Sequence, residues 1–225
     1  LMPSFNSQDV ANSISSLATL NVKLDKSYRD AITKHIEKIG DSFHAKELVN
    51  IFWAFQKLDT TLHFNLLQRI VDMQLNAQDV ATTLYTISQI PFKILSKSSS
   101  ENIKLLKRSL VLLQSKMLEL TPKANHQDVA NTLYAVARMN ETSAYFKKND
   151  ALTETLVTSA IRKISSSSSV TMTKFTSAQV AQIVSCVTVV PINLLVTFER
   201  AVNSELRRVS SQMSLQGIAS IFSAS

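Results

Sequence analysis

Hydrophobic and polar residues follow a helical rhythm along this chain, and the rhythm starts again several times. The segment NHQDVANTLYAVARM (125–139) is nearly repeated as NSQDVANSISSLATL (6–20) and NAQDVATTLYTISQI (76–90), and segments 43–58 and 175–190 keep the pattern. Aligned on Asp9, Glu47, Asp79, Asp128 and Gln179, with Gly217 in an incomplete sixth copy, the segments are spaced by 38, 32, 49, 51 and 38 residues. Periods of roughly 20 to 50 residues are typical of solenoid proteins.

Each repeated segment predicts one α-helix, which we call the repeat helix, starting near residues 7, 45, 77, 126, 177 and 215. Three residues before the aligned position stand Asn6, His44, Asn76, Asn125 and Thr176. Asn and Thr are good N-caps, and an acidic or amide residue three positions later completes a capping box; His44 fits least well. The apolar residues that follow lie on one helical face. They are Val10, Ile14, Leu17; Leu48, Phe52, Phe55; Val80, Leu84, Ile87; Val129, Leu133, Val136; and Val180, Val184, Val187.

A second amphipathic segment follows each repeat helix. These segments are 26–39, 61–73, 102–118, 151–164 and 193–209. A single helix–turn–helix pair cannot bury both of its faces, whereas stacked pairs can. We therefore predict an all-α fold. The predicted architecture is a right-handed α-solenoid of repeats of about 38 residues. Five full repeats and one partial repeat are expected to form a single array over residues 1–225. Because both ends lie next to or inside a repeat helix, we expect the chain to be part of a longer protein.

Composition excludes several classes of protein. Hydrophobic residues make up 45% of the chain, which argues against disorder, and two glycines are too few for a β-sandwich or a phosphate-binding loop. No histidine pairs with a carboxylate or cysteine at metal-ligand spacing, and Cys186 takes a position held by small residues in the other repeats. We expect no catalytic residue, no metal, no cofactor and no membrane-spanning helix.

Three positions opposite the apolar face of the repeat helices form a recurring polar and aromatic series. In the second, third and fourth repeats they hold an amide or hydroxyl, an aromatic ring, and a long polar or basic side chain. We call them the polar ladder, with these members: Asn12, Asn50, Trp53, Lys57, Thr82, Tyr85, Gln89, Asn131, Tyr134, Arg138 and Gln182. Amides read base edges, aromatic rings stack on bases, and basic side chains hold phosphates.

A structural interpretation of the polar ladder stands beside this one. Trp53, Tyr85 and Tyr134 lie close to the apolar face and are equally suited to fill space between adjacent repeats. Asn50 and Asn131 are able to bond their counterparts in adjacent repeats rather than a ligand. The formal charge of +7 favours an anionic partner. Lys104, Lys107 and Arg108, within about one helical turn, are candidate phosphate contacts.

The segments AKELVNIFWAFQKL (45–58) and HQDVANTLYAVARM (126–139) resemble octotricopeptide repeats, and the second also resembles heptatricopeptide repeats. The chain departs from the family in its irregular spacing, in lacking the proline-rich repeat start, and in a fifth repeat with neither an aromatic nor a basic ladder residue. The resemblance implies a non-catalytic organellar α-solenoid that binds a transcript or rRNA. It also implies neighbouring ribosomal or scaffold proteins as partners, as in a mitochondrial ribosome subunit or assembly factor.

The resemblance implies a mitochondrial location. The alternatives are a chloroplast, the cytoplasm of a bacterium, or secretion from a bacterium into a host cell. The alternative function is a protein–protein interaction scaffold, including one from an intracellular bacterium, because concave helical surfaces also bind peptides.

Overall fold

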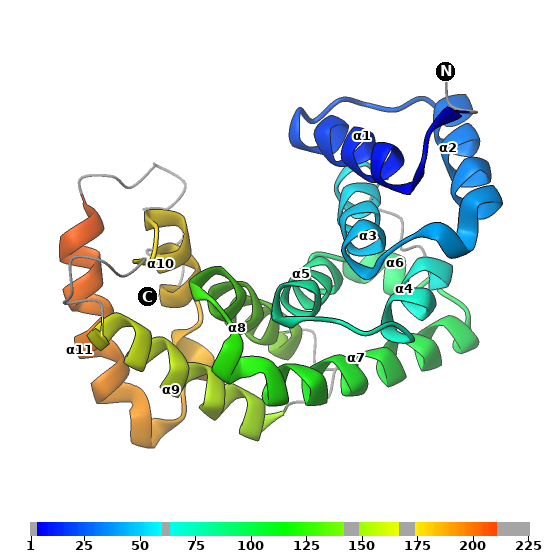
Figure 1. Cartoon of the computed structure of the whole chain (residues 1–225). Helices are drawn as coiled ribbons and strands as arrows, with labels where there is room; N and C mark the ends of the chain where they lie inside the picture. Colours follow the sequence, from blue (N-terminus) through cyan, green and yellow to red (C-terminus); the bar gives the residue numbers. More distant parts are fainter. Residues whose placement is uncertain (1–3, 60–63, 142–148, 167–173, 211–225) are drawn as a thin grey trace. The chain divides into compact units, whose positions relative to one another are not determined.

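A computed structural model of the chain describes residues 4–59, 64–141, 149–166 and 174–210 (Figure 1). Every regular element in these ranges is helical and none is a strand, so the all-α prediction is confirmed there. The repeat helices are α1 (Ser7–Thr19), α3 (Ala45–Asp59), α5 (Ala77–Ser88), α8 (His126–Glu141) and α10 (Ser177–Val184). They begin at the predicted residues. The helix predicted near residue 215 lies outside the described residues.

A second helix follows each repeat helix, as predicted. These helices are α2 (Lys26–Ile39), α4 (Phe64–Val71), α7 (Ser100–Leu120), α9 (Asp150–Ser166) and α11 (Ile192–Val209). The sequence analysis did not predict the short helix α6 (Phe92–Leu95) or the 3-10 turns η2 (Gly40–Ser42), η3 (Thr121–Lys123) and η4 (Val187–Val189). The described residues therefore alternate between repeat helices and second helices.

Reciprocal capping bonds start most repeat helices. At α8 the Asp128 amide donates to the Asn125 side-chain oxygen at 3.0 Å, and the Asn125 amide donates to the Asp128 carboxylate at 2.9 Å. The same pair of bonds occurs at Asn6–Asp9, Asn76–Asp79 and Thr176–Gln179. At α3 the His44 backbone amide donates to the Glu47 carboxylate at 2.9 Å, which is one of the two bonds of a capping box. Each box satisfies backbone donors that a helix start leaves unpaired.

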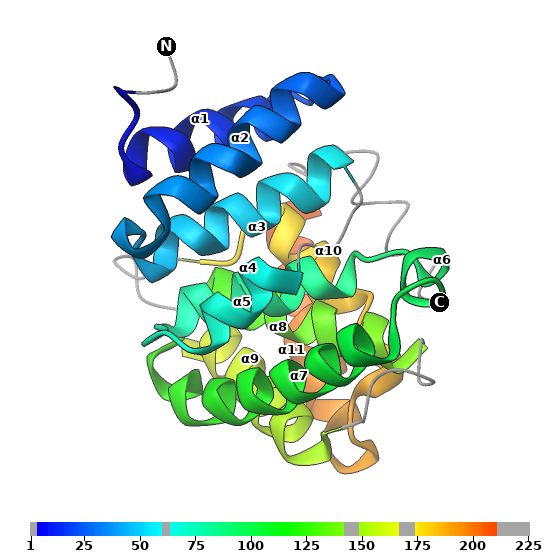
Figure 2. The same cartoon turned by 90° about the vertical axis from the view of Figure 1, so that its right-hand side faces the viewer.

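The chain divides into two compact units. The first comprises residues 1–75 and 89–109, and the second comprises 76–88 and 110–225, so α7 contributes to both. Within the first unit, α1 packs against α2 and α3, and α3 packs against α4 (Figure 2). Ile14, Phe52 and Phe55, three of the predicted core residues, are almost fully buried there. The single array over residues 1–225 stays a prediction.

In the second unit α8 lies between α5 and α10 (Figure 1). The second helix α9 packs against α8 and α11, and α11 also packs against α10. Ala81, Ala130 and Ala181 are buried on the three repeat helices, at 0%, 0% and 4% exposure. A side chain as small as alanine lets neighbouring helices approach closely, so these positions set the spacing of α5, α8 and α10.

The fifth repeat helix is shorter than the repeated segment predicts. It ends at Val184, and the 3-10 turn η4 replaces its last turn, which leaves Val184 and Val187 half-buried rather than in the core. Pro191 disfavours helical geometry at the preceding residue, and Val190 is extended, with φ −66° and ψ 127°. Leu17 of α1 is also only half-buried. The other predicted core residues of the repeat helices are buried.

Candidate nucleic-acid interface

The two tyrosines of the polar ladder contact each other in the second unit. The rings of Tyr85 on α5 and Tyr134 on α8 have centroids 5.8 Å apart and are tilted by 34°. Both side chains are half-buried. Burial raises the pKa of Tyr85 above 10.0; the neighbouring Tyr134 raises it further and Arg138 lowers it. The pair therefore joins adjacent repeat helices, and the exposed parts of both rings stay on the surface.

Arg138 extends this aromatic pair with a cation. It is exposed on α8, its guanidinium lies 6.0 Å from the centre of the Tyr134 ring, and Nη1 donates to the Tyr134 hydroxyl at 3.4 Å. An arginine held near an aromatic ring retains its charge. The end of α8 thus presents a phenol and a guanidinium side by side.

The amides of the ladder bond each other across repeats. The Asn131 side-chain oxygen accepts from Gln127 at 2.7 Å on the same helix and from Gln182 of α10 at 3.4 Å. Gln179 of α10 in turn donates to the Gln127 oxygen at 2.7 Å. Asn131 therefore bonds its counterpart in the adjacent repeat, as the structural interpretation expects, and its two N–H donors are the groups most available to a ligand.

The first unit carries a smaller set of ladder residues. Lys57 Nζ lies 5.2 Å from the Trp53 ring on α3, so this pair has the same arrangement as Tyr134 and Arg138. Trp53 and Asn50 are half-buried, whereas Asn12 on α1 is exposed. These side chains resemble those of the second unit in chemistry.

Two further ladder residues, Thr82 and Gln89, are seven positions apart in the sequence and belong to different units. Thr82 and Gln89 are half-buried. Thr82 is in the second unit, and Gln89, just beyond the end of α5, belongs to the first. The Thr82 carbonyl accepts the Thr86 hydroxyl at 2.7 Å.

The predicted phosphate contacts are accessible. Lys104, Lys107 and Arg108 are all exposed on the part of α7 that belongs to the first unit, and among the described residues none forms an ion pair. Their spacing of three and four residues places them on neighbouring positions of one helix face. Three charges so arranged suit a run of phosphates better than a single carboxylate.

Groups that could carry other chemistry are not assembled in the described ranges. No three of the His, Cys, Asp and Glu side chains found there lie together as metal ligands. Cys186 is fully buried and donates its thiol to the Gln182 carbonyl at 2.9 Å. None of the helices that the structure describes is long and apolar enough to cross a membrane.

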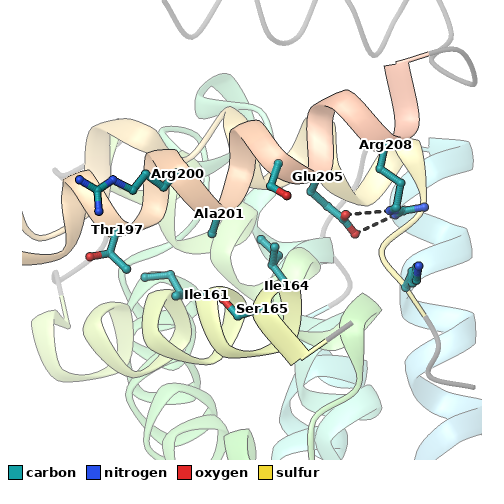
Figure 3. A pocket seen from close by; sticks show the side chains of 10 residues that line it. Ile161, Ile164, Ser165, Thr197, Arg200, Ala201, Glu205 and Arg208 are labelled. Carbon is teal, nitrogen blue, oxygen red and sulfur yellow. Dashed lines mark hydrogen bonds and ion pairs between the residues drawn. The ribbon is translucent and has the colours of Figure 1, made fainter. Parts of the chain in front are cut away.

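A groove between α9 and α11 was not predicted from the sequence (Figure 3). It encloses about 460 Å³ within the second unit, and Lys174, Arg200 and Arg208 contribute its basic side chains. The sequence does contain a signal for this groove, namely two arginines, Arg200 and Arg208, whose spacing of eight residues places them on one face of a helix. The sequence analysis treated this part of the chain only as a second helix.

The chain was also compared with known proteins. It matches no family model, and no curated protein matches it significantly. The octotricopeptide resemblance therefore stays a prediction that rests on the residues quoted for it.

Proposed function

We propose that this protein is a non-catalytic RNA-binding helical-repeat protein whose stacked helix–turn–helix units form an α-solenoid. The packing of α8 between α5 and α10 supports this proposal, since it brings ladder residues of three successive repeats into contact, Tyr85 with Tyr134 and Asn131 with Gln182. Aromatic edges, free amide donors and an exposed guanidinium are groups that contact single-stranded RNA. The formal charge of +7 also favours an anionic partner such as RNA.

The bonding within this surface favours recognition of shape and backbone. The side-chain oxygens of Asn131 and Gln127 already accept hydrogen bonds from amides of α10, Gln182 and Gln179. The Tyr85 and Tyr134 rings are partly occupied by each other. An amide engaged in this way cannot form the bidentate pairs that distinguish one base from another. We therefore propose contact with the backbone and stacked bases of a transcript or rRNA, with a mitochondrial ribosome subunit or assembly factor as the setting.

A filter-binding titration tests this proposal. Single-stranded and structured RNA are titrated between about 50 and 200 mM salt, and affinity is expected to fall steeply as salt increases because binding releases counterions. Arg138→Gln should reduce the salt slope by about 0.7, the contribution of one phosphate contact on a single strand. Arg162→Gln, an exposed arginine on α9 outside the ladder, is the matched control. Absence of binding at low salt, or an affinity independent of salt, contradicts the proposal.

A protein scaffold is the second candidate, and a different observation favours it. Ile192 and Val196, one turn apart on α11, are 85% and 59% exposed. Adjacent exposed aliphatic side chains mark protein contact surfaces. A stoichiometric protein partner that survives nuclease treatment and is lost from the double variant Ile192→Ser, Val196→Ser would support this function over RNA binding.

A further inference from the structure

A second groove lies between α9 and the end of α7 with its following turn η3, and we call it the η3–α9 groove. It encloses about 400 Å³, within the range of roughly 300–1,000 Å³ for ligand sites, and its lining residues all belong to the second unit. The α9 side of the groove is one stripe of the helix, with steps of one turn between its members. These members are Ala151, Glu154, Thr155, Thr158, Ser159 and Arg162.

Much of the remaining surface of the groove is apolar. Leu118 at the end of α7 and Pro122 in η3 contribute aliphatic groups. The hydroxyls of Thr121 and Thr155 donate to backbone carbonyls four residues earlier, at 2.7 and 2.8 Å, so neither hydroxyl needs a partner in the groove. A ligand therefore gains free energy by placing an apolar side chain here, because apolar surface on both sides leaves water.

One buried polar group of the groove has no partner. Ser159 is 3% exposed, and its hydroxyl forms no hydrogen bond within the described part of the chain. A buried hydroxyl without a partner costs free energy, so a ligand that bonds it is favoured. A partner helix cannot supply this bond from its backbone, since its amides and carbonyls are paired along the helix. An extended peptide has unpaired backbone groups and therefore suits this hydroxyl.

Two exposed side chains of opposite charge line the same groove. Glu154 and Arg162 form no ion pair or hydrogen bond with any residue that the structure describes. Their eight-residue separation on one helix face corresponds to about 12 Å, at about 1.5 Å per residue. In an extended chain, residues four apart are separated by about 13 Å and point to the same side. The two charges therefore match an acidic and a basic residue four positions apart in an extended segment.

We propose that the η3–α9 groove binds an extended segment of a partner protein. An acidic residue of the segment pairs with Arg162, and a basic residue four positions away pairs with Glu154. An apolar residue midway between them packs against Leu118 and Pro122, and a backbone group of the segment bonds the Ser159 hydroxyl. The site goes beyond RNA binding, since none of its residues belongs to the polar ladder.

Methyl NMR titration of the whole chain with capped pentapeptides tests the proposal. The mixed-charge peptide, acetyl-Glu-Ala-Leu-Ala-Lys-amide, should shift the methyl resonances of Leu118 and Thr155, whereas Ile183, buried in α10, should not move. Replacing its lysine with glutamate, or its glutamate with lysine, should weaken binding by about threefold, because one exposed ion pair is lost. Acetyl-Ala-Glu-Leu-Lys-Ala-amide has the same composition but directs both charges away from the leucine side, and should weaken as much. Unshifted Leu118 and Thr155 methyls at saturation, or equal affinity for all four peptides, overturn the proposal.

A charge reversal should change which peptide the groove prefers. In Arg162→Glu both charges of the groove are acidic, so the variant should bind the peptide with two lysines about threefold more tightly than the mixed-charge peptide. Arg207→Glu is the matched control, because it changes the net charge equally at an exposed arginine of α11 that does not line the groove. It should keep the preference of the wild type. The same preference in both variants contradicts the proposal.

A second pair of variants tests the buried hydroxyl. Ser159→Ala should weaken the mixed-charge peptide by about threefold without lowering the free energy of unfolding, because the hydroxyl has no bond to lose in the free chain. Ser109→Ala is the matched control, since Ser109 is also buried, also lacks a partner and lies outside the groove. Its affinity for the peptide should be unchanged. Equal affinities of the two variants would show that no backbone group of the segment bonds Ser159.

Two further measurements separate this inference from its alternatives. A crosslinked helical peptide with an acid and a base eight residues apart represents a partner helix. If it shifts the Leu118 methyls and binds more tightly than the mixed-charge peptide, the extended segment is wrong. RNA titrations at saturating peptide should give the same affinity as without peptide. A chain that binds the peptide as expected but fails to bind RNA contradicts the proposed function and leaves the groove proposal standing.

Discussion

At the scale of single residues, Asp128 performs two conflicting tasks. Its carboxylate accepts the Asn125 amide at 2.9 Å and so completes the capping box of α8. The side chain is nevertheless only 3% exposed, and burial raises its pKa above 3.8, although the Asn125 amide and the charge of Lys163 lower it. Burial disfavours the charged form that the capping bond prefers.

This conflict predicts a pH-dependent stability. Because the pKa of Asp128 is higher in the folded chain than its ordinary value of 3.8, the folded chain binds this proton more tightly than the unfolded chain. The Asp128 contribution to stability therefore falls as pH rises from 3.8 through the folded pKa. Asp128→Asn keeps a capping oxygen and removes the titration, so its free energy of unfolding should rise relative to the wild type across that window.

Urea unfolding of both proteins between about pH 3 and pH 7 measures this difference. The same experiment on Asp9→Asn, at the exposed capping box of α1, serves as the control for replacing a capping carboxylate that is not buried. A difference between Asp128→Asn and the wild type that stays constant across the pH range would contradict the prediction.

Tyr134 also has two interpretations at this scale, and two substitutions separate them. If its ring mainly fills space against Tyr85, Tyr134→Ala should lower the free energy of unfolding by about 2 kcal/mol. Tyr134→Phe keeps the ring and should cost less than about 0.5 kcal/mol, because the bond from Arg138 is long. Chemical denaturation and RNA titration are measured on both variants. An alanine variant of unchanged stability with strongly reduced RNA affinity would show that the ring mainly serves the ligand.

At the scale of elements, the recurring alanines determine how closely the repeat helices pack. Ala130 is fully buried on α8, which has α5 on one side and α10 on the other. Ala130→Leu would add three carbons to this tight contact, so we expect a loss of about 1–3 kcal/mol in the free energy of unfolding. Ala178→Leu, at an exposed position of α10, is the control and should change stability by less than about 0.5 kcal/mol. Equal stability of the two variants would show that α8 has space at Ala130.

Elements were predicted well where local sequence decides them. A capping pair needs only two residues three positions apart, such as Asn125 with Asp128 or Thr176 with Gln179. The structure has a helix start at both of these pairs. The end of α10 was predicted poorly. There the Ser185 hydroxyl and the Cys186 thiol both bond the Gln182 carbonyl, at 2.8 and 2.9 Å, ahead of Pro191. Hydrophobic periodicity does not report such side-chain bonds, so the shortened helix was not predicted.

At the scale of the whole molecule, the positive charge should control the encounter with RNA. The triple variant Lys104→Gln, Lys107→Gln, Arg108→Gln should reduce the salt slope of RNA binding by about 2, or about 0.7 for each lost phosphate contact. The control triple variant Lys26→Gln, Lys34→Gln, Lys38→Gln changes three exposed lysines of α2 and lowers the net charge equally. Filter binding measures both. Identical slopes for the two variants would mean that only net charge matters and that the α7 cluster makes no direct contact.

The sequence by itself determined the all-helical class of the described residues, the starts of five repeat helices and most of the apolar core. These properties depend on capping residues and on a period of about 3.6 residues, both of which are local. Only the tertiary structure decided that Tyr85 contacts Tyr134, that Gln182 bonds Asn131, and that α9 and α11 enclose a groove. These partners lie on different helices, with 51 positions separating Gln182 from Asn131. Their contacts depend on how the helices pack, which no local pattern records.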